Sequence, residues 1–271
     1  MATEARNTAL STSGMNVYHE DEELIQAWQW KSPPLRALDD MVLDLLDDGP
    51  ARVLDLGCGS GRLSAALGGA GFQVDGIDVE ARAVELGRRI LRRSGVSGVT
   101  LYDGDAFDSE HPVATGKYDA MVCVEVLEHV DRWRELLSRG IELLRPGGQL
   151  VVTVPRDPKQ FTMLDEYGGH LRRFDDEELL SALRDSCEDI YVRRPGWPTM
   201  RGIVWIYTRL LRVLGRTYDN EARTLWREPG ALKRFAIWAT YRLLKFDDLF
   251  AGLPFGTHLV VSARKRTDAT A

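Results

Sequence analysis

The 271-residue sequence has few cysteines and no long apolar run. Its three cysteines, Cys58, Cys123 and Cys187, lie far apart and form no Cys-x-x-Cys pair, which argues against a disulfide framework and against a thiolate zinc site. No stretch approaches the roughly 20 apolar residues that cross a bilayer, and residues 1–14 are polar and do not resemble a signal peptide. We therefore expect a cytoplasmic protein whose cysteines are reduced.

Charge is unevenly distributed along the chain. The net charge is −6, yet residues 1–192 hold 20 Lys and Arg against 35 Asp and Glu, whereas residues 193–246 hold 12 against 3. The acidic majority makes a nucleic acid an unexpected main partner, while the basic segment could meet an anionic one. With 44% apolar residues the chain can bury a proper core, and its length suits one large α/β domain with additions.

A glycine-rich stretch stands out in residues 53–64, Val-Leu-Asp-Leu-Gly-Cys-Gly-Ser-Gly-Arg-Leu-Ser. An apolar run ends near Asp55, glycines follow at Gly57, Gly59 and Gly61, and a helical pattern begins at Arg62. This order predicts a strand, a tight turn and a helix. Glycines accept positive φ and let a ligand approach the backbone, so the turn fits a dinucleotide, S-adenosylmethionine or a purely structural role.

Two details separate these readings. Arg62 stands where the dinucleotide fingerprint Gly-x-Gly-x-x-Gly would have its last glycine. The carboxylate of Asp55 also precedes the turn, and it suits a cationic amino group better than a pyrophosphate. The stretch resembles the first motif of the class I S-adenosylmethionine-dependent methyltransferases, Val-Leu-Asp-Leu-Gly-Cys-Gly-x-Gly. The resemblance covers roughly residues 51–155 and becomes weaker outside that span.

Further acids follow the next predicted strands. Residues 72–78 end at Asp78, about 20 residues beyond the first glycine, where a carboxylate can accept ribose hydroxyl groups in either cofactor class. Residues 99–107 contain a Gly-Asp-Ala sequence, and the resemblance implies that its acid lies against adenine. On these grounds S-adenosylmethionine would bind at Asp55, Gly57, Gly59, Asp78, Val79, Asp105 and Ala106.

The remaining elements predict the fold class. Residues 117–124 read as a buried central strand, followed by a helix over 131–144, an Arg-Pro-Gly-Gly turn and a strand over 149–155. This series resembles the fourth and fifth elements of the same family. It implies an α/β, Rossmann-like sheet of seven strands, mostly parallel with an antiparallel last strand. Strands six and seven are expected at 189–194 and 257–263.

Three regions are expected. Residues 1–49 would form an N-terminal helical cap with helices at 21–30 and 35–46, and residues 50–196 and 257–266 the cofactor-binding core. Residues 197–256 would form a helical insertion with helices at 203–214 and 231–246. These two helices are apolar on one side and arginine-rich on the other. That pattern favours a lid or dimer contact, with a membrane-surface contact as the alternative.

The segment after residue 124 carries the candidate catalytic groups. Glu125, Glu128 and His129 stand at i, i+3 and i+4, which places them on one face if a helix starts near Glu125. The Glu-Val-Leu-Glu-His sequence resembles that of ubiquinone-pathway O-methyltransferases, in which this cluster is the metal site, and of metal-dependent small-RNA 2′-O-methyltransferases. The resemblance implies Mg²⁺ or Zn²⁺, with His170 as a further ligand. The alternative is that the acids only favour a helix N-terminus.

Together these features predict a small-molecule methyltransferase that acts on a hydroxyl group, with His129 as the base that removes its proton. N-methylation, RNA 2′-O-methylation, an NAD-type dehydrogenase and a non-catalytic binding module with this fold are the alternatives. A monomer and a homodimer are both compatible with the sequence. His258, which opens the last predicted strand, looks incidental.

Overall fold

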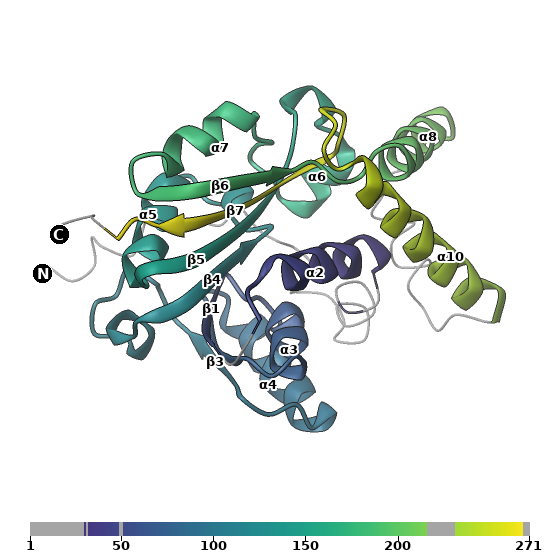
Figure 1. The fold of residues 1–271 in the computed structure, drawn as a ribbon. Coiled ribbons are helices and arrows are strands. Elements are labelled where there is room, and N and C mark those ends of the chain that lie inside the picture. The colour runs from purple at the N-terminus through teal and green to yellow at the C-terminus, as the bar shows by residue number, and fades with distance from the viewer. Residues whose placement is uncertain (1–29, 31, 49–50, 216–230, 268–271) are drawn as a thin grey trace, which may run out of the picture.

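A computed structural model describes residues 30, 32–48, 51–215 and 231–267 (Figure 1). Seven strands form one sheet in the order β3-β2-β1-β4-β5-β7-β6. They are β1 (Arg52–Leu56), β2 (Gln73–Asp78), β3 (Val99–Asp103), β4 (Tyr118–Val124), β5 (Leu144–Pro155), β6 (Cys187–Arg193) and β7 (His258–Lys265). Only β7 is antiparallel to its neighbours. The predicted mostly parallel, seven-stranded α/β sheet is confirmed.

The helices fall close to their predicted ranges. They are α2 (Pro33–Leu45), α3 (Arg62–Gly69), α4 (Ala81–Ser94), α5 (Trp133–Leu143), α6 (Met163–Gly168), α7 (Asp176–Leu183), α8 (Thr199–Val213) and α10 (Ala231–Asp247). Short 3-10 helices occur at Pro112–Thr115, Leu127–His129, Pro158–Gln160 and Asp248–Phe250. Within the described residues, no helix has the length and apolar character needed to cross a membrane.

Alternating apolar residues on the strands build a core on each face of the sheet. On one face, Leu54 and Met121 pack with Trp133 of α5. On the other, Val53 and Val122 pack with α2 and α3. Because adjacent strand residues point to opposite faces, strands covered by helices on both sides need apolar residues at nearly every position. The sheet therefore lies between two helical layers.

The insertion between β6 and β7 extends from the carboxyl edge of the sheet, where α8 and α10 project away from the strands (Figure 1). One of its contacts with the main body is made by α10 on α2. The Tyr241 hydroxyl donates to Asp40 Oδ2 at 2.5 Å, and Lys245 Nζ lies 3.8 Å from Asp44 Oδ2. The predicted cap helix over 35–46 thus meets the insertion.

One local prediction falls almost entirely outside the described residues, and two others turn out differently. The helix predicted over 21–30 lies outside the described residues except for Trp30. The Arg-Pro-Gly-Gly segment belongs to the start of β5, whose pairing with β4 shifts register between Tyr118 and Ala120. The third strand ends at Asp103 and does not continue to residue 107, because Asp105 Oδ1 accepts the Phe107 N–H at 2.9 Å and turns the chain.

Candidate functional site

The acids predicted at the strand ends share one edge of the sheet. In the order β3-β2-β1 the carboxyl ends of these strands are neighbours, and in the β2–β3 ladder Asp78 pairs with Asp103. Asp78 faces the glycine turn: its Oδ2 accepts the Gly59 N–H at 2.8 Å, and its Oδ1 accepts the Glu80 N–H at 2.9 Å. Each carboxylate oxygen has a second acceptor site, which leaves capacity for ligand hydroxyl groups.

The glycine turn has no room for a side chain at two of its glycines. Gly57 and Gly61 have φ of +78° and +73°. A Cβ on Gly57 would lie 2.4 Å from Val126 Cγ2, and one on Gly61 would lie 2.7 Å from Leu101 Cδ1. Neither position has room for a side chain, so the turn packs its backbone directly against Val126 and Leu101. A close-packed glycine turn beside the Asp78 carboxylate would fit the nucleoside portion of S-adenosylmethionine.

Asp55 lies behind this surface. Its carboxylate is 2% exposed and accepts the Ser64 hydroxyl at 2.5 Å. Burial raises its pKa to about 6, although the hydrogen bond from Ser64 and the charge of Arg62 oppose the shift. In this structure Asp55 ties β1 to the first turn of α3 and so supports the glycine turn, while its contact with the cofactor stays a prediction.

Arg62, which departs from the dinucleotide fingerprint, joins the turn to the cap. Its guanidinium pairs with Asp39 of α2 and donates to the Leu35 carbonyl oxygen at 3.1 Å. The pair is largely shielded from solvent, since the side chain of Arg62 is 15% exposed and that of Asp39 8%. A glycine at this position could not hold α2 in place.

The other predicted cofactor residues lie at the same edge with different exposure. Val79 directly follows β2 and is 43% exposed, whereas Ala106 is 7% exposed and belongs to the apolar core. Asp105, which directly precedes Ala106, is half-buried and closes the turn after β3. This edge of the sheet therefore presents an exposed apolar side chain, a carboxylate and a buried apolar residue, a combination that would suit a flat ring.

Glu125 is not helical, so the predicted common face of three residues does not form. Its φ is +56°, and only a short 3-10 helix, Leu127–His129, follows. Its Oε1 accepts the Thr153 hydroxyl at 2.9 Å, and its Oε2 lies 3.5 Å from His258 Nε2. Burial alone would raise the pKa of Glu125, but the charge of His258 and the hydrogen bonds outweigh it and lower the pKa.

Glu128 and His129 meet His170 instead. The Nε2 atoms of His129 and His170 each lie 3.9 Å from Glu128 Oε1, and one ligand atom from each residue lies within 4.8 Å of the other two. His129 Nδ1 lies 3.1 Å from the Gly169 carbonyl oxygen, and His170 Nδ1 lies 3.0 Å from Asp165 Oδ1. Because these oxygens accept, each Nδ1 donates a proton to its partner, and the Nε2 atom of each ring faces Glu128 Oε1.

This cluster has the electrostatics of a cation site. Burial lowers the pKa of His129 to about 4, so the ring is neutral at physiological pH. Glu128 is fully buried, neither of its oxygens has a hydrogen-bond partner among the described residues, and burial together with the charge of Glu125 raises its pKa. An unpartnered buried carboxylate is costly. A divalent cation between the three groups would relieve that cost.

Two of the groups that support the site could not be predicted from the sequence. Asp165, which orients His170, also closes a capping box at the start of α6 with Thr162. The Thr-x-x-Asp spacing could have signalled that helix, but not the contact with histidine. His258 lies against Glu125 although β7 and β4 are far apart in sequence, and no local pattern announces that contact.

Comparisons with known proteins agree with this geometry. The sequence profile of a family described as a methyltransferase domain matches residues 22–186. A ubiquinone biosynthesis O-methyltransferase of Aromatoleum aromaticum is 31% identical over 217 residues, 75% of this chain and 91% of the relative. One from Xanthomonas oryzae pv. oryzae is 36% identical over 145 residues, 50% of this chain and 59% of the relative.

Solved structures share the fold. A methyltransferase of Thermotoga maritima, described as a possible histamine N-methyltransferase, has a TM-score of 0.59 at 18% identity and covers 93% of this chain and 99% of its own. Phosphoethanolamine N-methyltransferase 2 of Haemonchus contortus, in complex with S-adenosyl-L-methionine, also has a TM-score of 0.59, at 17% identity, over 96% of this chain and 58% of its own.

Proposed function

Because this chain belongs to the methyltransferase-domain family and is an S-adenosylmethionine-dependent methyltransferase, we propose that it methylates a hydroxyl group of a small molecule with the help of a divalent cation. The observation that carries the proposal is the convergence of two imidazoles, those of His129 and His170, on the buried carboxylate of Glu128, which has no hydrogen-bond partner among the described residues. The relatives named for ubiquinone biosynthesis O-methylation support a hydroxyl acceptor.

The cofactor roles follow from the carboxyl edge of the sheet. When bound, S-adenosylmethionine supplies an electrophilic methyl group on a sulfonium. The backbone at Gly57 and Gly59 lies against the ligand, and Asp78 accepts from the ribose hydroxyl groups while it holds the Gly59 N–H. Val79 contacts the base. Asp105 accepts from the exocyclic amine of adenine, beside Ala106.

The cation would be held by Glu128, His129 and His170. When bound there, it would lower the pKa of the acceptor hydroxyl and favour the alkoxide or phenolate that attacks a methyl group. Asp165 and the Gly169 carbonyl oxygen fix the ring orientations and tautomers, as the outer groups of metal sites do. Glu125, predicted as a ligand, adds negative charge from its position against His258.

The alternative predicted for His129, a general base with no cation, uses the same Nε2 lone pair. The two mechanisms differ in what a chelator does. With the cation, treatment with EDTA should lower turnover by about a hundredfold, and Mg²⁺ or Zn²⁺ should restore it. With the base alone, EDTA should have no effect while His129→Ala remains inactive.

The experiment incubates the purified chain with labelled S-adenosylmethionine and a set of catechols, aliphatic alcohols and amines, and follows methyl transfer by mass. Glu128→Gln and His170→Gln should abolish both transfer and calorimetric binding of the cation. Glu110→Gln, on an exposed loop, is the matched control that should change neither. Transfer to amines only, insensitive to EDTA, would replace the proposal with N-methylation.

For the insertion we propose the lid role: residues 197–256 cover the acceptor side of the cofactor core, and residues 1–49 cap it. The contact of α10 with α2 supports this arrangement. The exposed apolar residues of α8 and α10, with Trp205 63% exposed and Phe235 62% exposed, are the reason to test a homodimer and an anionic membrane surface as alternatives. Sedimentation and vesicle flotation of the whole chain distinguish them.

A further inference from the structure

One arginine holds the loop that carries His170. Arg173 Nε donates to Asp165 Oδ1 at 2.8 Å, the same oxygen that lies 3.0 Å from His170 Nδ1. The side chain of Arg173 is 10% exposed and that of Asp165 1%, so the ion pair is shielded from water. Because the pair joins residues eight positions apart, it closes a short loop, and His170 lies inside that loop.

The guanidinium of Arg173 is also anchored to two carbonyl groups. Its Nη1 donates to the Arg156 oxygen at 3.2 Å and to the Thr257 oxygen at 3.3 Å. Arg156 directly follows β5 and Thr257 directly precedes β7, and these two strands are paired. A guanidinium presents its donors in a rigid, planar fork. Since Nη1 is fixed to the ends of two paired strands, Nε holds Asp165 in a defined place relative to the sheet.

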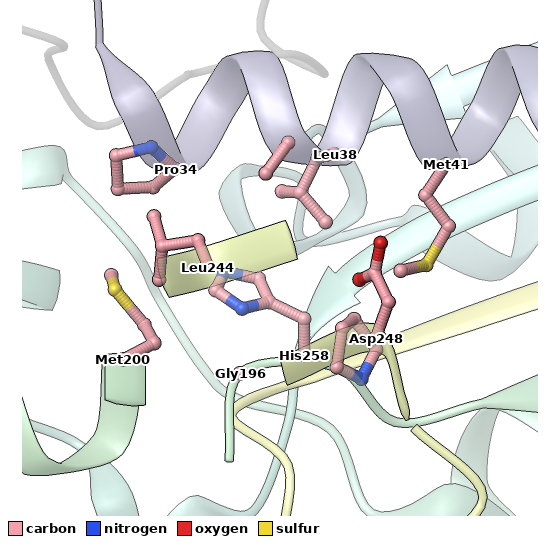
Figure 2. A pocket seen from close by; sticks show the side chains of 10 residues that line it. Pro34, Leu38, Met41, Gly196, Met200, Leu244, Asp248 and His258 are labelled. Carbon is pink, nitrogen blue, oxygen red and sulfur yellow. The ribbon is translucent and has the colours of Figure 1, made fainter. Parts of the chain in front are cut away.

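The anchor at Thr257 belongs to a packed part of the molecule. Figure 2 shows the next residue, His258, among side chains of α2, α8 and α10. The ring of His258 lines one pocket with Leu38 of α2, and the Thr257 N–H donates to the Pro195 oxygen at 2.9 Å. The carbonyl group that accepts from Arg173 is therefore part of the junction where the insertion leaves and re-enters the sheet.

The loop also touches the cation cluster through its backbone. The Leu171 N–H donates to the Glu128 carbonyl oxygen at 2.9 Å, and the His170 N–H donates to the Asp165 carbonyl oxygen at 2.9 Å. The Nε2 atom of His170 lies 3.9 Å from Glu128 Oε1. The position of this imidazole beside the carboxylate therefore depends on the loop that Arg173 closes.

We propose that Arg173 is a positioning residue: by pairing with Asp165 it keeps the loop of His170 in place, so that this ligand is ordered before a cation binds. The inference rests on the proposed function for the identity of the ligands Glu128, His129 and His170. When ligands are already ordered, binding does not have to order them at a cost in conformational entropy, and the affinity is higher. Outer groups that orient metal ligands typically change metal affinity by about 10- to 100-fold.

The first measurement needs no cation. Hydrogen exchange of the Leu171 amide, followed by NMR on the full chain, reports how often the loop opens. Arg173→Gln should speed this exchange by about tenfold or more, the lower end of the effect of losing a hydrogen bond to a charged group. Arg194→Gln is the matched control, because this partly buried arginine pairs at 2.6 Å with Asp176 instead of Asp165, and it should leave the exchange unchanged. Equal acceleration in both variants, or none in Arg173→Gln, would overturn the proposal.

Calorimetry with Zn²⁺ on the full chain, freed of metal by EDTA and dialysis, tests the consequence for the cluster. Zn²⁺ is the probe because histidine nitrogen and glutamate oxygen are among its usual ligands. Arg173→Gln should raise the Kd by about 10- to 100-fold, whereas Arg194→Gln should keep the wild-type Kd. In an Asp165→Asn background, Arg173→Gln should add less than about twofold, because both changes break the same ion pair. Additive effects, or an unchanged Kd, would refute the assignment.

The conservative variant and the cation-free measurement keep the outcomes separate. If Arg173→Gln does not fold, Arg173→Lys keeps the charge, but one ammonium group cannot hold Asp165 and both carbonyl groups at once. Arg173→Lys should change the exchange and the Kd in the same directions, and wild-type values would overturn the proposal. If the wild type binds no Zn²⁺, the proposed cation is refuted, while faster Leu171 exchange in Arg173→Gln would still support the role of Arg173 and unchanged exchange would refute it.

Discussion

Replacing Gly57 by alanine should destabilise the protein through two separable effects. The first is the backbone, because φ of +78° costs a residue with a Cβ about 1–2 kcal/mol. The second is the new methyl group, which would lie 2.4 Å from Val126 Cγ2 and 2.7 Å from Val126 Cγ1. Such overpacking costs about 1–3 kcal/mol when neighbours have to shift. Gly57→Ala should therefore lower the free energy of unfolding by about 2–5 kcal/mol.

Two further substitutions separate the backbone cost from the steric cost. Gly71→Ala changes a residue with φ of +97° and no atom within 4 Å of its Cβ, so it should show the backbone cost alone. Val126→Ala in the Gly57→Ala background removes both clashing methyl groups and should recover the steric part, a coupling of about 1–3 kcal/mol. Urea unfolding of all variants measures these values, and titration with S-adenosylhomocysteine measures the cofactor site in those that fold. If Gly57→Ala costs no more than Gly71→Ala, the close contact with Val126 is refuted.

Asp78→Asn should weaken S-adenosylmethionine binding by about 10- to 150-fold, the loss expected for hydrogen bonds to a charged group, whereas Asp103→Asn at the next strand end should not; calorimetry compares them. Asp176 is held by Arg156 and Arg194 at 2.5 and 2.6 Å, and although burial opposes it, these bonds lower its pKa. Its contribution to stability is present above the unfolded pKa of about 3.9 and is lost as pH falls through the lower folded value. Urea midpoints of wild type and Asp176→Asn should therefore converge below about pH 4, and a gap that persists there would contradict the assignment.

The fold and the cofactor edge could be predicted because their signals are local. A parallel strand that ends in an acid brings that acid to the shared carboxyl edge whatever the exact order of strands, so the position of Asp78 could be predicted without tertiary knowledge. Asp105 lies at the same edge in the turn that follows β3. The burial of Asp55 could not be read in this way. A carboxylate before a glycine turn looks the same in sequence whether it faces a ligand or, as here, the Ser64 hydroxyl.

The cluster of Glu128, His129 and His170 could not be predicted from local sequence patterns. The i, i+3, i+4 rule assumes helical dihedral angles, whereas Glu125 has a positive φ and its carboxylate lies against His258. The third member, His170, lies just after α6, and Asp165 holds its ring through a hydrogen bond. These contacts depend on how separate elements pack against one another, and the periodicity of a single sequence does not predict that packing.

Helix α2 links the glycine turn to the insertion. Its Asp39 pairs with Arg62 at the glycine turn, while its neighbour Asp40 accepts the Tyr241 hydroxyl of α10. Adjacent residues of a helix point about 100° apart, so one helix can touch both places at once. A largely buried ion pair broken on one side leaves an uncompensated charge. The position of α2 is therefore held at the glycine turn, and a substitution of Arg62 should also disturb the contact of α2 with α10.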